Sequence, residues 1–146
     1  MKGMQIGIRR ADWLQRMVLC RLEVRCFGFE RVLAGQWQRI GMTDVLAWTA
    51  HVDDEAAGLL IAYPHTIDGV VRPYIAVLGV VPQHRRCGLA RQLLQTALDF
   101  HSTAWLHVRV SNAVAIALYE SLHFTLVQRV ANYYRDGEDA LLMAKI

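Results

Sequence analysis

The segment 80–91 combines small and basic residues in a way that suits the binding of an anion. A β-branched run, 74–81, ends at Pro82, and a short basic loop then leads to Gly88 and Ala90 at the start of an amphipathic stretch. Backbone N–H groups at a helix N-terminus can hold a phosphate when the residues nearest to it are small. Three arginines add positive charge nearby, namely Arg85, Arg86 and Arg91. The pattern favours a cofactor that carries a pyrophosphate, and the alternative is an ordinary helix start in which Gly88 only relieves packing.

The same loop departs from two common phosphate-binding motifs. It lacks the Gly-Lys-Ser/Thr ending with which a nucleoside-triphosphatase loop grips Mg²⁺ and the γ-phosphate. It also lacks the three-glycine spacing of a dinucleotide-binding fold. We therefore expect neither kind of site, and the loop by itself leaves the identity of the cofactor open.

A second group of polar residues spans 107–112 and is followed by Tyr119. Asn112 is a good N-cap for a helix, and Tyr119 lies about two helical turns further on, so the two side chains share a helix face. Ala115 leaves that face open. A phenol there could reach a ligand that lies between the two strand-helix units. The alternative is a tyrosine that only packs its ring and exposes its hydroxyl.

His107 is a candidate for proton transfer. It shares the polar side of an alternating strand with Arg109 and Ser111, while Leu106 and Val108 point to the other side. An unperturbed imidazole has a pKa of about 6.5, which suits the uptake of a proton from an ammonium near neutral pH. The alternative is a surface histidine on a half-exposed strand.

The elements that must position these residues follow from hydrophobic periodicity and turn residues. The order predicted is β-α-α-β-β-β-α-β-α-β-β, a mixed α+β sheet flanked by helices, in a single domain over 1–146. A hairpin turn is expected at 52–55 and a loop at 65–69, and the acidic turns 53–55 and 136–139 are expected to be solvated. Strands are predicted at 4–9, 44–51, 56–63, 73–81, 105–110, 124–130 and 140–145, and helices at 12–26, 30–39, 85–101 and 113–122.

Composition excludes several classes of protein. The chain has 146 residues, 54% of them hydrophobic, which suits one domain with a sizeable core. No apolar run approaches the ~18 residues of a membrane span, and no secretory signal is evident. The three cysteines have no metal-ligand spacing and are expected to be reduced thiols of a cytoplasmic protein. A net charge of +3 is too small to indicate nucleic-acid binding.

Together the two constellations resemble the GNAT superfamily of acetyl-CoA-dependent N-acetyltransferases. The segment 85–90 matches the Arg/Gln-x-x-Gly-x-Gly/Ala loop of that family, and 106–124 matches its later strand-helix segment. The stretch 108–122, and Asn132-Tyr133-Tyr134 before 136–140, are similar to bacterial ribosomal-protein-alanine N-acetyltransferases. The resemblance is close over 74–146 and loose over 1–73.

The resemblance implies an acetyl-CoA site in a GNAT-like central twisted mixed sheet. The cofactor would enter a V-shaped opening between the strands predicted at 73–81 and 105–110. Asn112 would contact it at the head of the last helix, and Tyr119 would be the general acid that protonates the departing CoA thiolate. The pantetheine arm would pair with the backbone of Leu78, Gly79 and Val80. The pyrophosphate would be wrapped by Arg85, Arg86, Cys87, Gly88, Leu89, Ala90 and Arg91.

The acceptor side departs from the bacterial pattern, which has a glutamate at the position of His107. One branch of eukaryotic protein Nα-acetyltransferases is similar instead, because it has a Leu-His-Val strand and a Tyr-Ile pair matched here by Tyr74-Ile75. In that branch the histidine and tyrosine hold a water that relays the proton. The resemblance places four residues at the acceptor: Phe27, Gly28, Tyr133 and Tyr134.

The expected activity is direct transfer of an acetyl group to a primary amine, with the α-amino group of a protein N-terminus as the expected acceptor. One alternative is a small amine such as a polyamine, an amino sugar or an antibiotic. Another is a non-catalytic acyl-CoA-binding module. No metal, nucleic acid or membrane partner is expected, and the sequence leaves the oligomeric state open.

Overall fold

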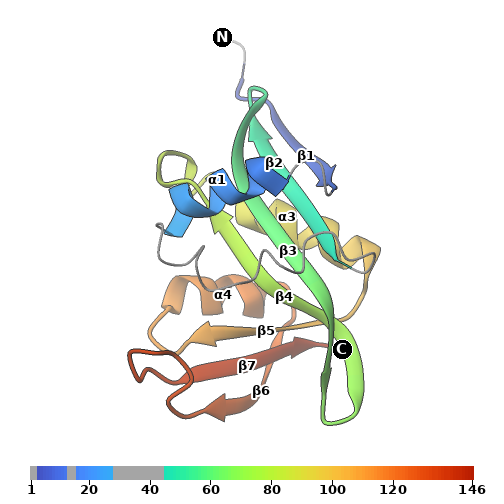
Figure 1. Ribbon diagram of the computed structural model, residues 1–146, viewed down its shortest axis with the longest axis vertical. Coiled ribbons are helices and arrows are strands. Elements are labelled where there is room, and N and C mark those ends of the chain that lie inside the picture. The colour runs from blue at the N-terminus through green and yellow to red at the C-terminus, as the bar shows by residue number, and fades with distance from the viewer. Residues whose placement is uncertain (1–2, 13–15, 28–44) are drawn as a thin grey trace.

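The described residues, 3–12, 16–27 and 45–146, form a seven-stranded sheet with flanking helices in this computed structural model (Figure 1). The strand order is β1-β2-β3-β4-β5-β7-β6, and among these described strands only the β4–β5 pair is parallel. The predicted mixed α+β class is confirmed, while the predicted helix at 30–39 lies outside the described residues. The elements are β1 (Ile6–Ala11), α1 (Arg16–Phe27), β2 (Leu46–Val52), β3 (Glu55–Ile67), β4 (Val70–Val80), the 3-10 turn η3 (Pro82–His84), α3 (Leu89–Phe100), β5 (Ala104–Arg109), α4 (Ala113–Ser121), β6 (Thr125–Val130) and β7 (Ala140–Lys145).

Helices α1 and α3 cover opposite faces of the sheet (Figure 1). A Cβ atom on Gly58 of β3 would lie 3.3 Å from Leu93 of α3, whereas one on Gly79 of β4 would lie 2.6 Å from the Phe27 ring of α1. The α3 stripe is buried as its periodicity predicts, through Leu89, Leu93, Leu94 and Ala97. The side chains buried between the sheet and these two helices form one large hydrophobic core.

Helix α3 begins four residues later than predicted. The chain first forms the 3-10 turn Pro82–His84, and Arg86 and Gly88 then take the left-handed conformation, with φ of 63° and 77°. Two left-handed residues interrupt the α-helical hydrogen bonding, so the helix starts only at Leu89. The basic residues before it therefore belong to a loop rather than to a helical turn.

The predicted loop at 65–69 is wrong in most of its length. Strand β3 continues to Ile67 and β4 starts at Val70, and the turn between them is Asp68-Gly69, with φ of 50° and 78°. An Asp-Gly pair with positive φ at both positions is a tight hairpin turn. His65 is consequently a strand residue, paired in register with Arg72.

A β-bulge in β4 decides which side chains reach the face covered by α1. The register pairs Ile75 with Ala62 but Val77 with Ile61, so Ala76 is the extra residue. Tyr74 therefore shares a face with Gly79, because its partner Tyr63 lies on the same side of β3 as Leu59, the partner of Gly79. Without the extra residue Tyr74 would point to the α3 side.

Strands β4 and β5 diverge from a single point of contact. Their only register pair in the described sheet is Tyr74 with Trp105. Figure 1 shows the two strands separating from there toward the ends at Val80 and Arg109. Diverging parallel strands leave backbone groups of β4 without a partner on the β5 side, which is where an extended ligand could add as a strand.

Candidate active site

Tyr74 and His107 meet across the β4–β5 contact. The Tyr74 hydroxyl and His107 Nδ1 are 2.8 Å apart, and both side chains are half-buried. Leu106 and Val108, the neighbours of His107, are buried as the strand alternation predicts. When Nδ1–H donates to the phenol oxygen, Nε2 carries the free lone pair. The pair can then hold a base in a fixed orientation.

Burial sets the protonation states of this pair. It lowers the pKa of His107 below its ordinary 6.5, and the nearby charge of His65 lowers it further. Burial likewise raises the pKa of Tyr74 far above its usual range, with a smaller contribution from the Tyr133 hydroxyl. At neutral pH the imidazole is therefore a free base and the phenol is protonated. The imidazole, and not the phenol, is the group able to take up a proton.

Aromatic rings enclose the pair. The Tyr133 ring stacks on His107 with centroids 4.3 Å apart and an interplanar angle of 15°, and its hydroxyl lies 3.5 Å from that of Tyr74. The rings of Tyr63 and His65 lie 5.7 and 5.3 Å from the Tyr74 ring. His65 was missed by sequence reasoning because it was assigned to a loop, although the Asp68-Gly69 turn could have placed it in a strand opposite Arg72.

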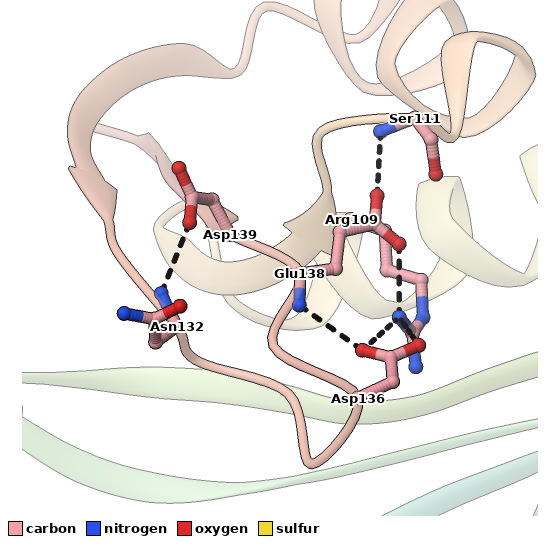
Figure 2. A network of polar contacts seen from close by, with 6 residues as sticks. All are labelled: Arg109, Ser111, Asn132, Asp136, Glu138 and Asp139. Carbon is pink, nitrogen blue, oxygen red and sulfur yellow. Dashed lines mark hydrogen bonds and ion pairs between the residues drawn. The ribbon is translucent and has the colours of Figure 1, made fainter.

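The β6–β7 loop (131–139), which carries Tyr133, is fastened to the end of β5 (Figure 2). Arg109 Nη1 lies 2.9 Å from both Asp136 Oδ2 and Glu138 Oε1. The Ser111 N–H donates to Glu138 Oε2 at 3.0 Å, and the Asn132 N–H donates to Asp139 Oδ1 at 3.0 Å. The acidic turn 136–139 is solvated as predicted at Asp136, whose side chain is 61% exposed, while Glu138 and Asp139 are half-buried and all three carboxylates are paired. The sequence held no signal for Arg109 and the Ser111 N–H as partners, which lie at the end of β5 and just after it.

The basic loop before α3 leaves open space next to the N-terminus of that helix. A Cβ on Gly88 would meet no atom within 4 Å, so a ligand has room to approach the backbone there. Arg86 and Arg91 are exposed, and Arg91 donates to Ser121 Oγ at 2.9 Å. Cys87 and Ala90 are half-buried at the same loop. The side chain of Leu89 is 1% exposed and belongs to the core, so only its backbone is available to a ligand.

Arg85 is engaged with protein backbone. Its Nε donates to the Val80 carbonyl at 3.1 Å and its Nη2 donates to the Cys26 carbonyl at 3.0 Å. The side chain therefore joins the end of β4 to the end of α1. It shapes the loop, and a phosphate near this loop would be met by the other arginines and by N–H groups.

Three of the remaining predicted residues have clear positions, and Gly28 lies outside the described residues. Phe27 packs directly on Gly79, which brings the expected acceptor side next to the strand expected to bind the donor. Asn112 caps α4 as predicted, since its Oδ1 accepts from the Ala115 N–H at 3.2 Å. Tyr119 is 8% exposed on α4, and its ring lies 5.8 Å from that of Phe124. The structure thus gathers Tyr74, His107, Tyr133 and Tyr134 in one cluster and the loop residues in another.

Two kinds of feature are absent from the described residues. No group of three His, Cys, Asp or Glu side chains is arranged to bind a metal ion within 3–12, 16–27 and 45–146. Over the same part of the chain, no helix has the length and apolar character needed to cross a membrane.

These features suit a class of protein that holds an extended, phosphate-bearing ligand beside a half-buried imidazole–phenol pair. The family model described as the Acetyltransferase (GNAT) family matches residues 16–124. The chain belongs to this family.

Similar proteins sharpen the comparison. An N-alpha-acetyltransferase of Saccharolobus solfataricus is 42% identical over 82 residues, which is 52% of this chain and 49% of that protein. The ribosomal protein bS18-alanine N-acetyltransferase of Escherichia coli is 48% identical over 75 residues, 46% of this chain and 51% of its own length. The chain thus aligns with about half the length of these curated relatives.

Solved structures align over nearly the whole chain. The crystal structure of the ribosomal-protein-S18-alanine N-acetyltransferase from Escherichia coli has a TM-score of 0.76 and 29% identity, covering 97% of this chain and 93% of that one. Arabidopsis thaliana NAA60 in complex with acetyl-CoA has a TM-score of 0.78 and 22% identity, covering 96% and 97% of the two chains. The second likeness concerns the fold alone.

Proposed function

We propose that this protein transfers the acetyl group of acetyl-CoA to the α-amino group of a protein N-terminus. The observation that carries the proposal is the 2.8 Å contact between Tyr74 and His107, because it holds a neutral imidazole in a site enclosed by tyrosines. Membership of the GNAT acetyltransferase family supports the reaction class. The names of the similar archaeal and bacterial proteins support the choice of an N-terminal α-amine.

The donor would lie between β4 and β5. The open space over Gly88 and the exposed Arg86 suit a pyrophosphate at the start of α3. The backbone of Leu78, Gly79 and Val80 is bonded to β3 on one side and faces the diverging β5 on the other. That free side suits the amide groups of a pantetheine arm, which can pair as an added strand.

The acceptor amine must lose a proton before it can attack. His107 would take up that proton, either directly or through a water held with Tyr74, and the neutral amine would then attack the thioester carbonyl carbon. Attack leaves a second proton on the nitrogen, which is then cationic. As the C–S bond breaks, the thiolate of CoA would receive a proton from the Tyr119 hydroxyl, and the nitrogen would give its second proton, by way of water, to the Tyr119 phenolate. The proton on His107 passes to solvent, so the products are the amide, the CoA thiol and one released proton, without a covalent enzyme intermediate.

The acceptor would enter from the side of α1 and the β6–β7 loop. Phe27, at the end of α1, is 37% exposed, and Tyr133 is 43% exposed beside His107. Partly exposed aromatic rings can contact a peptide backbone, and the Tyr133 hydroxyl can remain hydrated at the same time. We infer that these residues, with Tyr134, line the acceptor position.

We also infer a cytoplasmic location. Cys20, Cys26 and Cys87 are all free thiols, as is usual in a reducing compartment. Burial raises the pKa of the Cys26 thiol to about 11, so it stays protonated at neutral pH.

Replacement of the expected general acid tests this function. Wild type and Tyr119→Phe are compared in steady-state transfer from acetyl-CoA to a synthetic peptide with a free N-terminal alanine, with CoA release as the readout. Loss of the hydroxyl should lower kcat by about 10²-fold and leave the binding of acetyl-CoA nearly unchanged. Unchanged turnover in Tyr119→Phe would remove this residue from the mechanism, and a wild type that acetylates no peptide N-terminus would remove the proposed acceptor.

A further inference from the structure

Arg109 occupies a position from which it can act on the acceptor side without touching it. It is the last residue of β5 and lies two residues after His107, so both side chains are on the same face of the strand. Its guanidinium carbon lies 4.0 Å from the centroid of the Tyr134 ring. The Tyr134 and Tyr133 rings meet edge to face at 5.0 Å, and Tyr133 stacks on His107. A continuous series of contacts therefore runs from Arg109 to the imidazole.

Glu138 uses both of its carboxylate oxygens to hold Arg109 and the backbone of Ser111. Oε1 accepts from Arg109 Nη1 at 2.9 Å, and Oε2 accepts from the Ser111 N–H at 3.0 Å (Figure 2). Ser111 directly precedes Asn112, the N-cap of α4. One carboxylate thus joins the β6–β7 loop to the end of β5 and to the start of α4. Hydrogen bonds from Ser111 and Arg109 hold the pKa of Glu138 below its usual range, so the carboxylate remains charged at neutral pH.

The loop between the two tyrosines and Glu138 is closed by its own backbone bonds. The Tyr134 N–H donates to the Glu138 carbonyl at 3.1 Å, and the Gly137 N–H donates to the Tyr134 carbonyl at 2.9 Å. The Glu138 N–H donates to Asp136 Oδ1 at 3.1 Å. Because the loop is a closed turn, holding Glu138 and Asp136 in place also holds the tyrosines.

We propose that Arg109 and Glu138 are positioning residues that hold Tyr133 and Tyr134 over the His107–Tyr74 pair and thereby set the affinity for the acceptor. This inference rests on the proposed function for the identity of that acceptor. Exposed ion pairs contribute little to global stability. The Arg109 and Asp136 side chains are 40% and 61% exposed, and the Glu138 side chain is 24% exposed. Loss of the network should therefore change the affinity for the acceptor more than the free energy of unfolding.

The kinetic test compares Arg109→Gln and Glu138→Gln with wild type in the full-length protein. Glu138→Gln keeps the size of the side chain and removes its charge, whereas Arg109→Gln removes the charge and also shortens the side chain. For the peptide with an N-terminal alanine, the acceptor KM should rise about tenfold, because a small displacement of a positioning group weakens binding and alignment strongly. The KM for acetyl-CoA should stay within about twofold. The double variant should lose little more than either single one, since the two residues act on one contact.

A matched control is available on the far edge of the sheet. Arg9→Gln breaks an ion pair with Asp54 of the same kind, at 2.7 Å, with no contact to the β6–β7 loop. This variant should keep the wild-type KM for the acceptor peptide and the wild-type KM for acetyl-CoA. Arg109→Lys, which keeps the charge but lacks the forked geometry, should recover part of the acceptor affinity.

Hydrogen exchange of the substrate-free protein separates the inference from the proposed function. In Glu138→Gln, the amides of Tyr134, Gly137 and Glu138 should exchange at least about tenfold faster, while those of α3 are unchanged. Unchanged exchange, or equal changes in both KM values, would overturn the positioning role. If wild type acetylates only a small amine, the proposed acceptor fails, and the same comparison of KM values is made with that amine.

Discussion

The Tyr74 hydroxyl lies 2.8 Å from His107 Nδ1 although the two residues are 33 positions apart in the chain. The contact depends on the bulge at Ala76, which turns Tyr74 to the face covered by α1, and on the register pair between Tyr74 and Trp105. The two strands touch at the Tyr74–Trp105 pair and then diverge, and His107 lies two residues beyond that pair. The same divergence leaves β4 open beyond it, where the donor is proposed to lie.

Removal of the imidazole should abolish most of the transfer activity. His107→Gln keeps a polar side chain of similar size but cannot take up a proton, so kcat should fall by about 10²- to 10⁴-fold. The KM for acetyl-CoA should change little, because the loop before α3 is untouched. His101→Gln, at an exposed position after α3, is the matched control and should keep full activity. A His107→Gln variant with wild-type kcat would show that the base is elsewhere.

The pH profile should report the lowered pKa of His107. Since only the neutral imidazole accepts a proton, kcat/KM should rise with pH and reach its plateau with a midpoint below 6.5. The groups that face this ring are Tyr74, Tyr133 and His65. His65→Gln removes the coulombic contribution that lowers the pKa of His107, so the midpoint should move upward. A midpoint above 6.5 in wild type, or a downward shift in His65→Gln, would contradict this electrostatic account.

The same shift predicts how stability responds to acid. The folded state depresses the pKa of His107, so the unfolded chain takes up this proton first as pH falls. The contribution of the site to the free energy of unfolding is then complete above about 6.5 and declines below it. Urea unfolding of wild type and His107→Gln across this range should show a smaller acid-induced loss in the variant.

Two glycines with the same backbone conformation separate strain from ligand binding. Gly88 and Gly69 have φ of 77° and 78°, and a Cβ on either would meet no atom within 4 Å. Replacement of either by alanine should therefore cost about 1–2 kcal/mol of folding free energy from left-handed strain. Only Gly88→Ala should raise the KM for acetyl-CoA, because its new methyl group stands in the space proposed for the pyrophosphate. Equal effects of both variants on that KM would argue against the assigned loop.

Gly79 should be sensitive because of its neighbour Phe27. A Cβ there would lie 2.6 Å from the Phe27 ring and 3.0 Å from Cys26 Cβ, so the ring must move. Gly79→Ala should cost about 1 kcal/mol in urea unfolding, at the low end for overpacking, because Phe27 is 37% exposed and its ring has solvent on one side. In the double variant with Phe27→Ala, the alanine at 79 should cost less, because only the 3.0 Å contact with Cys26 Cβ remains. If the losses of unfolding free energy in the two single variants simply add in the double variant, the strand rather than the Phe27 ring moves to accommodate the new methyl group.

Local patterns predicted the helices α3 and α4 better than the contacts of the β6–β7 loop. The α3 stripe and the Asn112 cap depend on residues within a few positions of one another, so periodicity and capping rules found them. His107 on the polar side of β5 followed from alternation alone. The partner of Glu138 is Arg109, 29 positions away, and sequence spacing carries no information about such a contact. The predicted loop at 65–69 includes His65, whereas the actual turn is only Asp68-Gly69 and His65 is in β3.

The most direct test of the central claim is a competition assay in one reaction. Wild type receives acetyl-CoA together with equal amounts of three acceptors: a peptide with a free N-terminal alanine, the same peptide with a blocked N-terminus and an internal lysine, and spermidine. Mass spectrometry then locates the transferred acetyl group. The account predicts acetylation at the free N-terminal α-amine, lost in His107→Gln. Transfer mainly to the lysine side chain or to spermidine, or N-terminal transfer that survives in His107→Gln, would contradict it.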